Sequence, residues 1–486
     1  MRHHLTVSRN LLRTAGAILP PILVTLFLWY TSENEVTAWQ FILALALAII
    51  PGVAYSSWKR SANRLPLFAL ISFMYWLYYA VGVFWVEPTI SFKEATLPHT
   101  LPETTITGAT LMALVGVLVL FIGTRVRLTW RVGHPDIKLT SFSVKYLRAI
   151  LIIGSIIGLS SSSTYALGEG GRQIITILTN IIPTFAFAVL FASLLRKEAH
   201  YIDKLIIAGY VGLRFISGMS SGWLGAFVSL VVVMSLVYLA EKRRLPMTAL
   251  VLVAAFTLFF QVGKVEFRRE YWQTNSDAGR SEKIGFWINR SMDVWGEVLS
   301  NPSSDTIREA LEPSLTRVSL LTQTANVIDQ TPSVVPYQYG SLYYYMAITL
   351  IPRFVWPDKP SVNEANRFYQ VAYGLTGEDE LDDVSIAVGV LTESYINFGW
   401  IGVVVLMFLL GIVLEFYQRT FLAPDSGIFL TALGIVLIPQ FLGIELQLAQ
   451  YLGGVVQQIL LTVVVMLPII RFRYRSKELK LVTTPA

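Results

Sequence analysis

Apolar residues recur along this chain in runs of about twenty, separated by shorter polar stretches. A run of that length crosses a hydrocarbon core of roughly 30 Å as a helix, and lipid offers no partner for an unpaired backbone amide. Each run therefore predicts a transmembrane α-helix. The pattern predicts about twelve spans, near residues 14–31, 38–56, 66–86, 105–124, 146–160, 174–195, 203–219, 222–240, 246–263, 398–416, 427–444 and 451–470.

The longest polar interval runs from Lys264 to Asn397 and is rich in tryptophan and tyrosine, unlike a passive or disordered connection. We expect amphipathic helices at the membrane interface and a re-entrant piece near Leu342 to Phe354, where the apolar stretch is too short for a span. The fold class is thus an all-α polytopic transmembrane helical bundle. Its parts are spans within 1–263, a large extracytoplasmic loop at 264–397, three spans within 398–470 and a basic tail at 471–486.

Composition supports this prediction and excludes several kinds of chemistry. Apolar residues make up 54% of the chain and charged residues 14%, a balance that ordinary soluble domains do not show. The sequence has no cysteine, which excludes disulfides, thiolate zinc sites, iron–sulfur clusters and cysteine nucleophiles. The net charge of +6 does not predict nucleic-acid binding, because membrane orientation accounts for the loop cations.

Loop cations fall almost entirely on one side of the predicted topology. With a cytoplasmic N-terminus, the inside loops hold Lys59, Arg60, Arg64, Arg125, Arg127, Arg131, Lys138, Arg196, Lys197, Lys242, Arg243, Arg244, Arg419, Arg471, Arg473 and Arg475. The short outside loops hold Lys93 and Arg172. This asymmetry predicts both termini in the cytoplasm and the long interval on the periplasmic side of a bacterial inner membrane. The first apolar segment is predicted to be a retained anchor and not a signal peptide, because it ends in Trp29 and Tyr30 without a small-residue cleavage site.

The long interval contains many cations that membrane orientation does not require. They are Lys264, Arg268, Arg269, Arg280, Lys283, Arg290, Arg308, Arg317, Arg353, Lys359 and Arg367. Guanidinium groups match phosphate oxygens, so several converging arginines could hold a diphosphate without a metal. The alternative is that they pair with local acids such as Glu266, Glu270, Asp293, Glu297 and Glu309, or contact lipid headgroups.

Arg214 lies inside a predicted span, where a cation costs about 2.5 to 3.5 kcal/mol on insertion scales unless it faces a polar cavity. The small residues that follow it, from Ser217 to Gly222, would allow close approach of a neighbouring helix or a ligand. Arg214 could therefore face a site, or it could extend to the membrane surface.

Two strings in the long interval are distinctive. Ile351 to Pro360 contains three prolines, which stiffen the backbone that carries Arg353 and Lys359. Gly389 to Gly399 leads into the next span, and Glu393 and Asn397 would share one helical face. A carboxylate there could act as a general base for a sugar hydroxyl, or be a helix-start acid favoured by the dipole. Asp382 and Asp383 are weaker base candidates, and the histidines and carboxylates form no recognisable metal motif.

At these residues the sequence resembles the Wzy-type O-antigen or exopolysaccharide repeat-unit polymerases. The resemblance spans roughly residues 210–405 and rests on Lys264–Tyr271, Tyr337–Gly340, Ile351–Arg353, Trp356–Pro360 and Glu393–Gly399. It implies a metal-independent glycosyltransferase of GT-C-like architecture that needs no cofactor. Such enzymes transfer a growing glycan from one undecaprenyl diphosphate carrier to the non-reducing sugar of another lipid-linked repeat unit. The implied partners are these lipid-linked oligosaccharides and membrane lipids, with a chain-length regulator and a flippase as protein partners.

The site residues follow from this interpretation. Glu393 and Arg353 are expected to be catalytic, the expected diphosphate-binding residues are Arg214, Lys264, Arg268, Arg269, Arg353 and Lys359, and the expected sugar-binding residues are Tyr339, Tyr395 and Asn397. An O-antigen ligase is an alternative, since it would share the donor and architecture. A lipid-linked oligosaccharide flippase is a third possibility, although transporters usually show repeated halves and midplane polar residues, which this sequence lacks.

Overall fold

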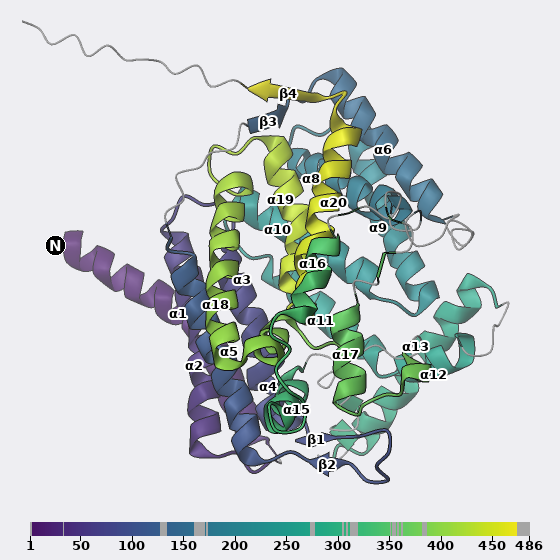
Figure 1. The fold of residues 1–486 in the computed structure, drawn as a ribbon. Coiled ribbons are helices and arrows are strands. Elements are labelled where there is room, and N and C mark those ends of the chain that lie inside the picture. Colours follow the sequence, from purple (N-terminus) through teal and green to yellow (C-terminus); the bar gives the residue numbers. More distant parts are fainter. Residues whose placement is uncertain are drawn as a thin grey trace, which may run out of the picture.

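The computed structural model describes residues 2–32, 34–126, 134–159, 171, 174–272, 278–303, 306–307, 310–311, 319–349, 351, 356, 359–360, 363–381 and 386–473. These residues form a tall bundle of mostly helical segments (Figure 1). The described part contains only four short strands, which pair as two antiparallel ribbons: β1 (Thr89–Ile90) with β2 (His99–Thr100), and β3 (His134–Ile137) with β4 (Ile470–Arg473).

The helices of the N-terminal half coincide with the predicted apolar runs, two of which include a π-helical turn, η1 and η3. They are α1 (Arg2–Tyr30), α2 (Ala38–Lys59), α3 (Leu67–Tyr75), η1 (Trp76–Ala80), α4 (Val81–Trp85), α5 (Glu103–Gly123), α6 (Ser141–Leu159), η3 (Ile177–Ile181), α8 (Ile182–Leu195), α9 (Tyr201–Ser221), α10 (Gly225–Lys242) and α11 (Met247–Gln261).

The predicted long interval is built mainly from short helices, and three further apolar helices follow it. The elements are α12 (Lys264–Tyr271), α13 (Arg280–Ser300), α15 (Leu321–Gln330), η4 (Ser341–Tyr343), α16 (Tyr344–Thr349), α17 (Glu364–Ala372), η5 (Glu378–Glu380), α18 (Val390–Phe421), α19 (Ile428–Leu442) and α20 (Leu448–Met466). The predicted boundary at Asn397 coincides with a break in α18, where Phe398 (φ −142°) and Gly399 (φ 59°) leave the helical conformation.

Eight of these helical segments are long and apolar enough to cross a membrane. They are α2, α3–α4, α5, α6, η3–α8, α10, α18 and α20, and α11 with α12, bent by 53°, makes a ninth if the pair is one span. The other predicted spans fall on the shorter apolar helices Ala15–Tyr30 and Ile428–Leu442, and on α9, which carries Asp203, Lys204 and Arg214. Within the described residues, length and composition thus support an all-α membrane protein with eight or nine spans, fewer than the twelve predicted.

Most of the core is one apolar cluster, within which α5 and α18 approach each other closely. A Cβ built on Gly411 of α18 would lie 2.2 Å from the carbonyl oxygen of Leu120 and 2.7 Å from the Cα of Gly123. The two helices therefore touch backbone to backbone, which only glycine permits at these positions.

A second, smaller cluster joins α12 and α13 to the ends of α9, α10 and α11. Its buried members are Met219, Leu224, Phe260, Phe267 and Trp287. The indole of Trp287 donates to the carbonyl of Phe260 (2.9 Å). On α13, Met292 and Leu299 remain exposed, so this helix keeps apolar side chains on its outer side.

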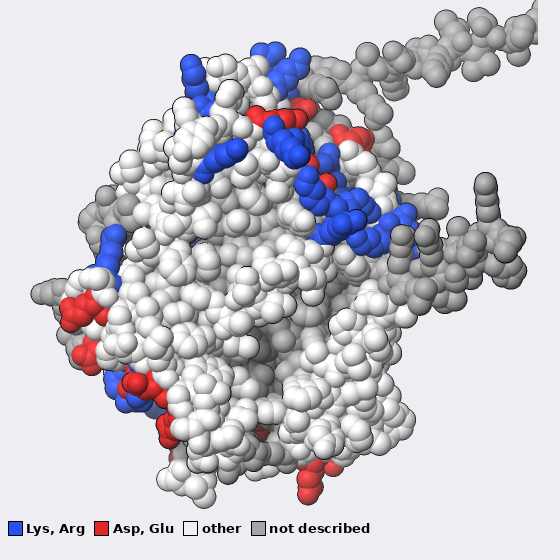
Figure 2. Space-filling model, turned by 180° about the vertical axis from the view of Figure 1, so that it is seen from behind, with Lys and Arg blue, Asp and Glu red and all other residues white. Residues whose placement is uncertain are grey.

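The loops predicted to face the cytoplasm meet at one end of the bundle. Arg64 donates to the carbonyls of Ala423 and Ser426, and Arg243 donates to those of Asn63 and Ser61. Seen from behind, Lys and Arg gather in a band toward this end, and a smaller group of mixed sign lies toward the other (Figure 2). The ribbon β3–β4 lies at the first end and β1–β2 at the second (Figure 1).

Candidate functional site

Glu393 occupies the first turns of α18 and is fully buried. Its Oε2 accepts a hydrogen bond from the backbone amide of Leu448 (2.6 Å), the first residue of α20. The hydrogen bond from that helix N-terminus offsets part of the cost of burying the carboxyl. Its Oε1 is buried without a hydrogen-bond partner among the described residues. A buried acceptor without a partner is uncommon, and it marks a place where a ligand hydroxyl could bind.

Tyr343 places a second unsatisfied polar atom in the same region. Its phenolic oxygen is also buried without a hydrogen-bond partner among the described residues. Burial, and then the negative charge of Glu393, raise the pKa of Tyr343 well above its ordinary value, so the phenol keeps its proton. A neutral phenol and a carboxyl oxygen can together hold a hydroxyl group, the phenol as donor and the carboxyl as acceptor.

Buried amide side chains hold the backbone around Glu393. Oε1 of Gln447, which precedes α20, accepts from the amide of Asn366 (2.8 Å). Oδ1 of Asn366 accepts from the amide of Val388 (3.3 Å), and Oε1 of Gln370 accepts from that of Ile386 (3.2 Å). These bonds tie α17 to the entry of α18 and to the start of α20. Sequence reasoning missed Asn366, Gln370 and Gln447, because isolated amides in polar or apolar stretches carry no distinguishing pattern.

The predicted sugar-binding residue Asn397 holds a loop against the break in α18. Because the helix stops at Phe398, the carbonyls of Ile396 and Asn397 lose their helical partners. They accept instead from the amides of Gln338 (3.0 Å) and Tyr339 (2.9 Å). The buried Asn397 side chain accepts from the amide of Gly340 (2.9 Å) and donates to the Glu393 carbonyl (2.9 Å). Asn397 therefore positions the loop beside Glu393.

Aromatic rings cover this loop and the break. The ring of Tyr395, predicted to bind sugar, lies between Tyr337 (6.2 Å between centroids) and Trp400 (6.2 Å). The ring of Tyr339, the other predicted tyrosine, contacts Phe398 (6.5 Å) and is 76% exposed. An exposed tyrosine held by a well-anchored loop can stack on a sugar ring.

A groove of about 650 Å³ lies beside η4, between α17 and η5. Its described lining mixes charged, amide and aromatic groups: Gln338, Ser341, Leu342, Tyr345, Glu364, Arg367, Phe368, Val371, Ala372, Glu378 and Leu381. Such a lining can hydrogen-bond the hydroxyls of a sugar and pack against its rings. Ser341 and Leu342 of η4 line the groove, whereas Tyr343 and Glu393 are not among its described lining residues.

The predicted diphosphate-binding cations of α12 lie in another part of the molecule. Figure 1 shows α12 and α13 well away from α18, on the far side of α17. Arg268 lies over the ring of Trp272 (4.2 Å), whose indole donates to Ser221 at the end of α9 (3.1 Å). Arg269 approaches Glu266 (3.5 Å), as does Arg290 (3.9 Å). Lys264 begins α12. Glu266 thus pairs with part of this positive charge. This agrees with the alternative given in the sequence analysis, in which the arginines of the long interval pair with local acids.

Three other predicted cations have separate environments. Arg214 donates to Oδ1 of Asn180 (2.6 Å) in the π-helical turn η3, so it bonds to a neighbouring helix. Lys359 is buried and donates to the carbonyls of Ile348 (3.5 Å), in the last turn of α16, and Ile351 (2.8 Å), just after that helix. Arg353 lies outside the described residues, as do Asp382 and Asp383. Among the residues that the structure does describe, no group of three His, Asp or Glu side chains could hold a metal ion.

Replacing Asn397 by alanine should destabilise the protein by about 1 to 3 kcal/mol. The backbone amide of Gly340 and the carbonyl of Glu393 would each lose the hydrogen bond that the Asn397 side chain makes to it. Hydrogen exchange should become faster at Tyr339 and Gly340, as measured by mass spectrometry on the detergent-solubilised protein. Ser394→Ala is the control, since the Ser394 hydroxyl bonds only within its own helix. Unchanged exchange in the loop would contradict the role given to Asn397.

The fold and the buried polar site define a multi-spanning, all-α membrane protein with a helical insertion before its last spans. The chain belongs to the family described as Domain of unknown function (DUF8712), whose model matches residues 105–423. That stretch runs from α5 to the end of α18 and includes Glu393. Comparisons with curated proteins and with solved structures gave no match.

Proposed function

We propose that this protein is a membrane glycosyltransferase that polymerises undecaprenyl-diphosphate-linked oligosaccharide repeat units into O-antigen or exopolysaccharide. The observation that carries the proposal is the buried Glu393 carboxyl, which has one oxygen fixed by α20 and the other buried without a partner among the described residues. The phenol of Tyr343, whose pKa burial and this carboxyl raise, is also buried without a partner among those residues. The resemblance of the long interval to repeat-unit polymerases supplies the substrate class.

In this proposal, Glu393 activates the acceptor. The sugar hydroxyl of one lipid-linked repeat unit donates to Oε1 of Glu393 and accepts from Tyr343. As the hydroxyl oxygen attacks the anomeric carbon of the donor glycan, its proton passes to Glu393. The bond between that carbon and the diphosphate oxygen breaks, and the undecaprenyl diphosphate leaves with the electron pair. Direct displacement inverts the anomeric carbon.

The groove beside η4 is the proposed acceptor-binding surface, with the exposed ring of Tyr339 next to it and Tyr395 buried among the neighbouring aromatic rings. Glu393 is fully buried and is not among the described residues that line the groove, so the proposal requires the protein to open before a sugar hydroxyl can reach the carboxyl. Exclusion of water from the closed site would favour transfer to the sugar over hydrolysis.

The leaving diphosphate requires cations that stabilise its negative charge. The proposal assigns this role first to Arg353. Lys359 ties the end of its proline-rich segment to Ile351, so residues 351–359 begin and end close to α16. The α12 cations lie well away from α18, so the proposal assigns Lys264, Arg268 and Arg269, together with Arg214 of the adjoining α9, to the membrane approach of the donor. Stabilisation of the developing negative charge would lower the barrier to transfer.

The proposal places the site at the periplasmic face of a bacterial inner membrane, with both termini cytoplasmic and about twelve crossings. The crossings beyond the eight or nine long apolar helices would be made by α1, α9 and α19. The grouping of the predicted inside loops at one end of the bundle agrees with this orientation. A GT-C-like architecture is part of the same proposal.

An O-antigen ligase is the alternative with the same donor and the same chemistry, since only the acceptor would differ. A flippase is less well supported, because transporters usually show repeated halves and midplane polar residues, which this sequence lacks. A gel profile of lipid-linked and surface glycans from cells lacking this protein separates the three. Loss of long chains with single repeat units retained at the surface is expected. A normal ladder left on the carrier would indicate a ligase, and repeat units trapped on the cytoplasmic leaflet would indicate a flippase.

A further inference from the structure

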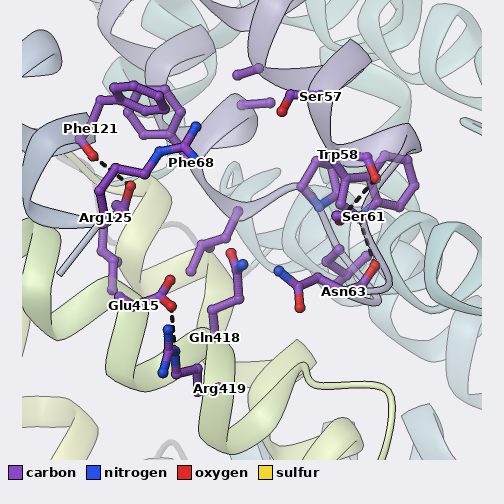
Figure 3. A pocket seen from close by; sticks show the side chains of 17 residues that line it. Ser57, Trp58, Ser61, Asn63, Phe68, Phe121, Arg125, Glu415, Gln418 and Arg419 are labelled. Carbon is purple, nitrogen blue, oxygen red and sulfur yellow. Dashed lines mark hydrogen bonds and ion pairs between the residues drawn. The ribbon is translucent and has the colours of Figure 1, made fainter. Parts of the chain in front are cut away.

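A second cavity lies at the opposite end of the bundle, where α2, α3, α5 and α18 have their ends. Its volume is about 420 Å³. Figure 3 shows the side chains of Asn63 and Gln418 extending into it from different elements, with Arg125 and Arg419 along one side. The site proposed for glycan transfer uses none of these residues.

The charged groups of this cavity favour an anion. The guanidinium of Arg125 lies over the ring of Phe121 (4.3 Å) and has no acidic partner among the described residues. Arg419 pairs with Glu415 one turn before it on α18. Two guanidinium groups and one carboxylate leave a net positive charge. The hydroxyl of Ser57 and the amides of Asn63 and Gln418 add neutral hydrogen-bonding groups around it.

The surroundings of the cavity indicate where the anion comes from. Leu111, Leu118 and Ile122 are exposed along one face of α5, and Phe121 of the same helix lines the cavity. On α18, Val405, Leu409 and Phe416 are exposed in the same way and lead toward Arg419. Exposed apolar stripes that end at a polar, positively charged cavity match a molecule with an anionic head and hydrocarbon chains.

We propose that this cavity binds the headgroup of an anionic membrane phospholipid. The phosphate lies between Arg125 and Arg419, the headgroup hydroxyls bond to Ser57, Asn63 and Gln418, and the acyl chains run along α5 and α18. The proposal depends on the chain being a membrane protein and not on its enzymatic activity.

Native mass spectrometry of the full-length protein, titrated with phosphatidylglycerol or phosphatidylcholine in detergent, tests this proposal. The wild type should bind phosphatidylglycerol more tightly than phosphatidylcholine. The double variant Arg125→Gln and Arg419→Gln should bind phosphatidylglycerol about thirtyfold more weakly. Ser57→Phe, which fills the cavity without changing charge, should weaken binding as well. Arg244→Gln is the matched control, an exposed arginine at the same end that does not line the cavity.

An equal loss in Arg244→Gln, or no loss in the double variant and in Ser57→Phe, would overturn the proposal. Competition by millimolar inorganic phosphate or glycerol 3-phosphate distinguishes a lipid from a soluble anion. Failure of both to displace phosphatidylglycerol supports the lipid site. Displacement by either at that concentration would identify a soluble phosphate as the ligand and overturn the lipid assignment.

Discussion

Cells that carry only the Glu393→Gln variant are expected to make single repeat units in place of long glycan chains, with the protein still present in the membrane. Glutamine can accept the Leu448 amide through its own oxygen, so the bond to α20 is retained. It cannot take the proton of an acceptor hydroxyl. Loss of a general base typically slows catalysis by about 10² to 10⁴. A glycan gel and an immunoblot of the membrane fraction give both readouts.

Asp425→Asn is the matched control for this variant, because Asp425 is an exposed acid at the opposite end of the bundle. It should leave the chain-length distribution unchanged. Normal chains in cells with Glu393→Gln would show that this carboxyl is not the base. If Arg353→Ala also left the chain length unchanged, the proposed site would be wrong. Loss of the protein from the membrane would show instead that the carboxyl is needed for folding.

Replacing Gly411 by valine is expected to destabilise the protein by more than about 3 kcal/mol. The new Cβ would overlap the carbonyl oxygen of Leu120 and the backbone of Gly123, neither of which can rotate away. Separating α5 from α18 would also disturb the contact between Gly116 of α5 and Leu391 of α18. Leu391 lies two residues before Glu393, so the site would be affected as well. Thermal unfolding of the purified protein in detergent should therefore shift to a markedly lower temperature, with the glycan product reduced in parallel.

Gly209→Val is the control, since a Cβ on Gly209 of α9 meets no atom within 4 Å. Its unfolding free energy should stay within about 0.5 kcal/mol of the wild type. The same unfolding temperature for Gly411→Val and the wild type would mean that α5 and α18 do not touch as closely as described.

Local pattern predicts the helices of this protein because the apolar runs are long and the lipid requirement is strict. The boundary that the sequence predicts after Asn397 falls at a break within α18, at Phe398 and Gly399. The number of spans is harder to predict. α1, α9 and α19 are short or charged, so hydropathy alone does not decide whether they cross.

For the candidate site too, the sequence predicted some features and only the tertiary structure showed the others. A carboxylate before a span can be picked out from the string Glu393 to Gly399, but its burial and its bond to the amide of Leu448 depend on a helix 55 residues away. Asn397 shares a face with Glu393, as the helical spacing predicts, yet its side chain holds the Gly340 loop. Tyr343 stands in a run of three tyrosines, and only packing shows that its phenol is the buried one.

The sequence by itself determined that this is a helical membrane protein with a long polar interval, because periodic burial in lipid leaves a direct record in hydropathy. Only the tertiary structure decided which polar groups meet. It brought Glu393 to Tyr343 and the start of α20, and it left the α12 cations in a separate cluster with α9 and α13. The physical reason is that such contacts arise from helix packing between distant segments, and packing depends on shape, to which local residue patterns are insensitive.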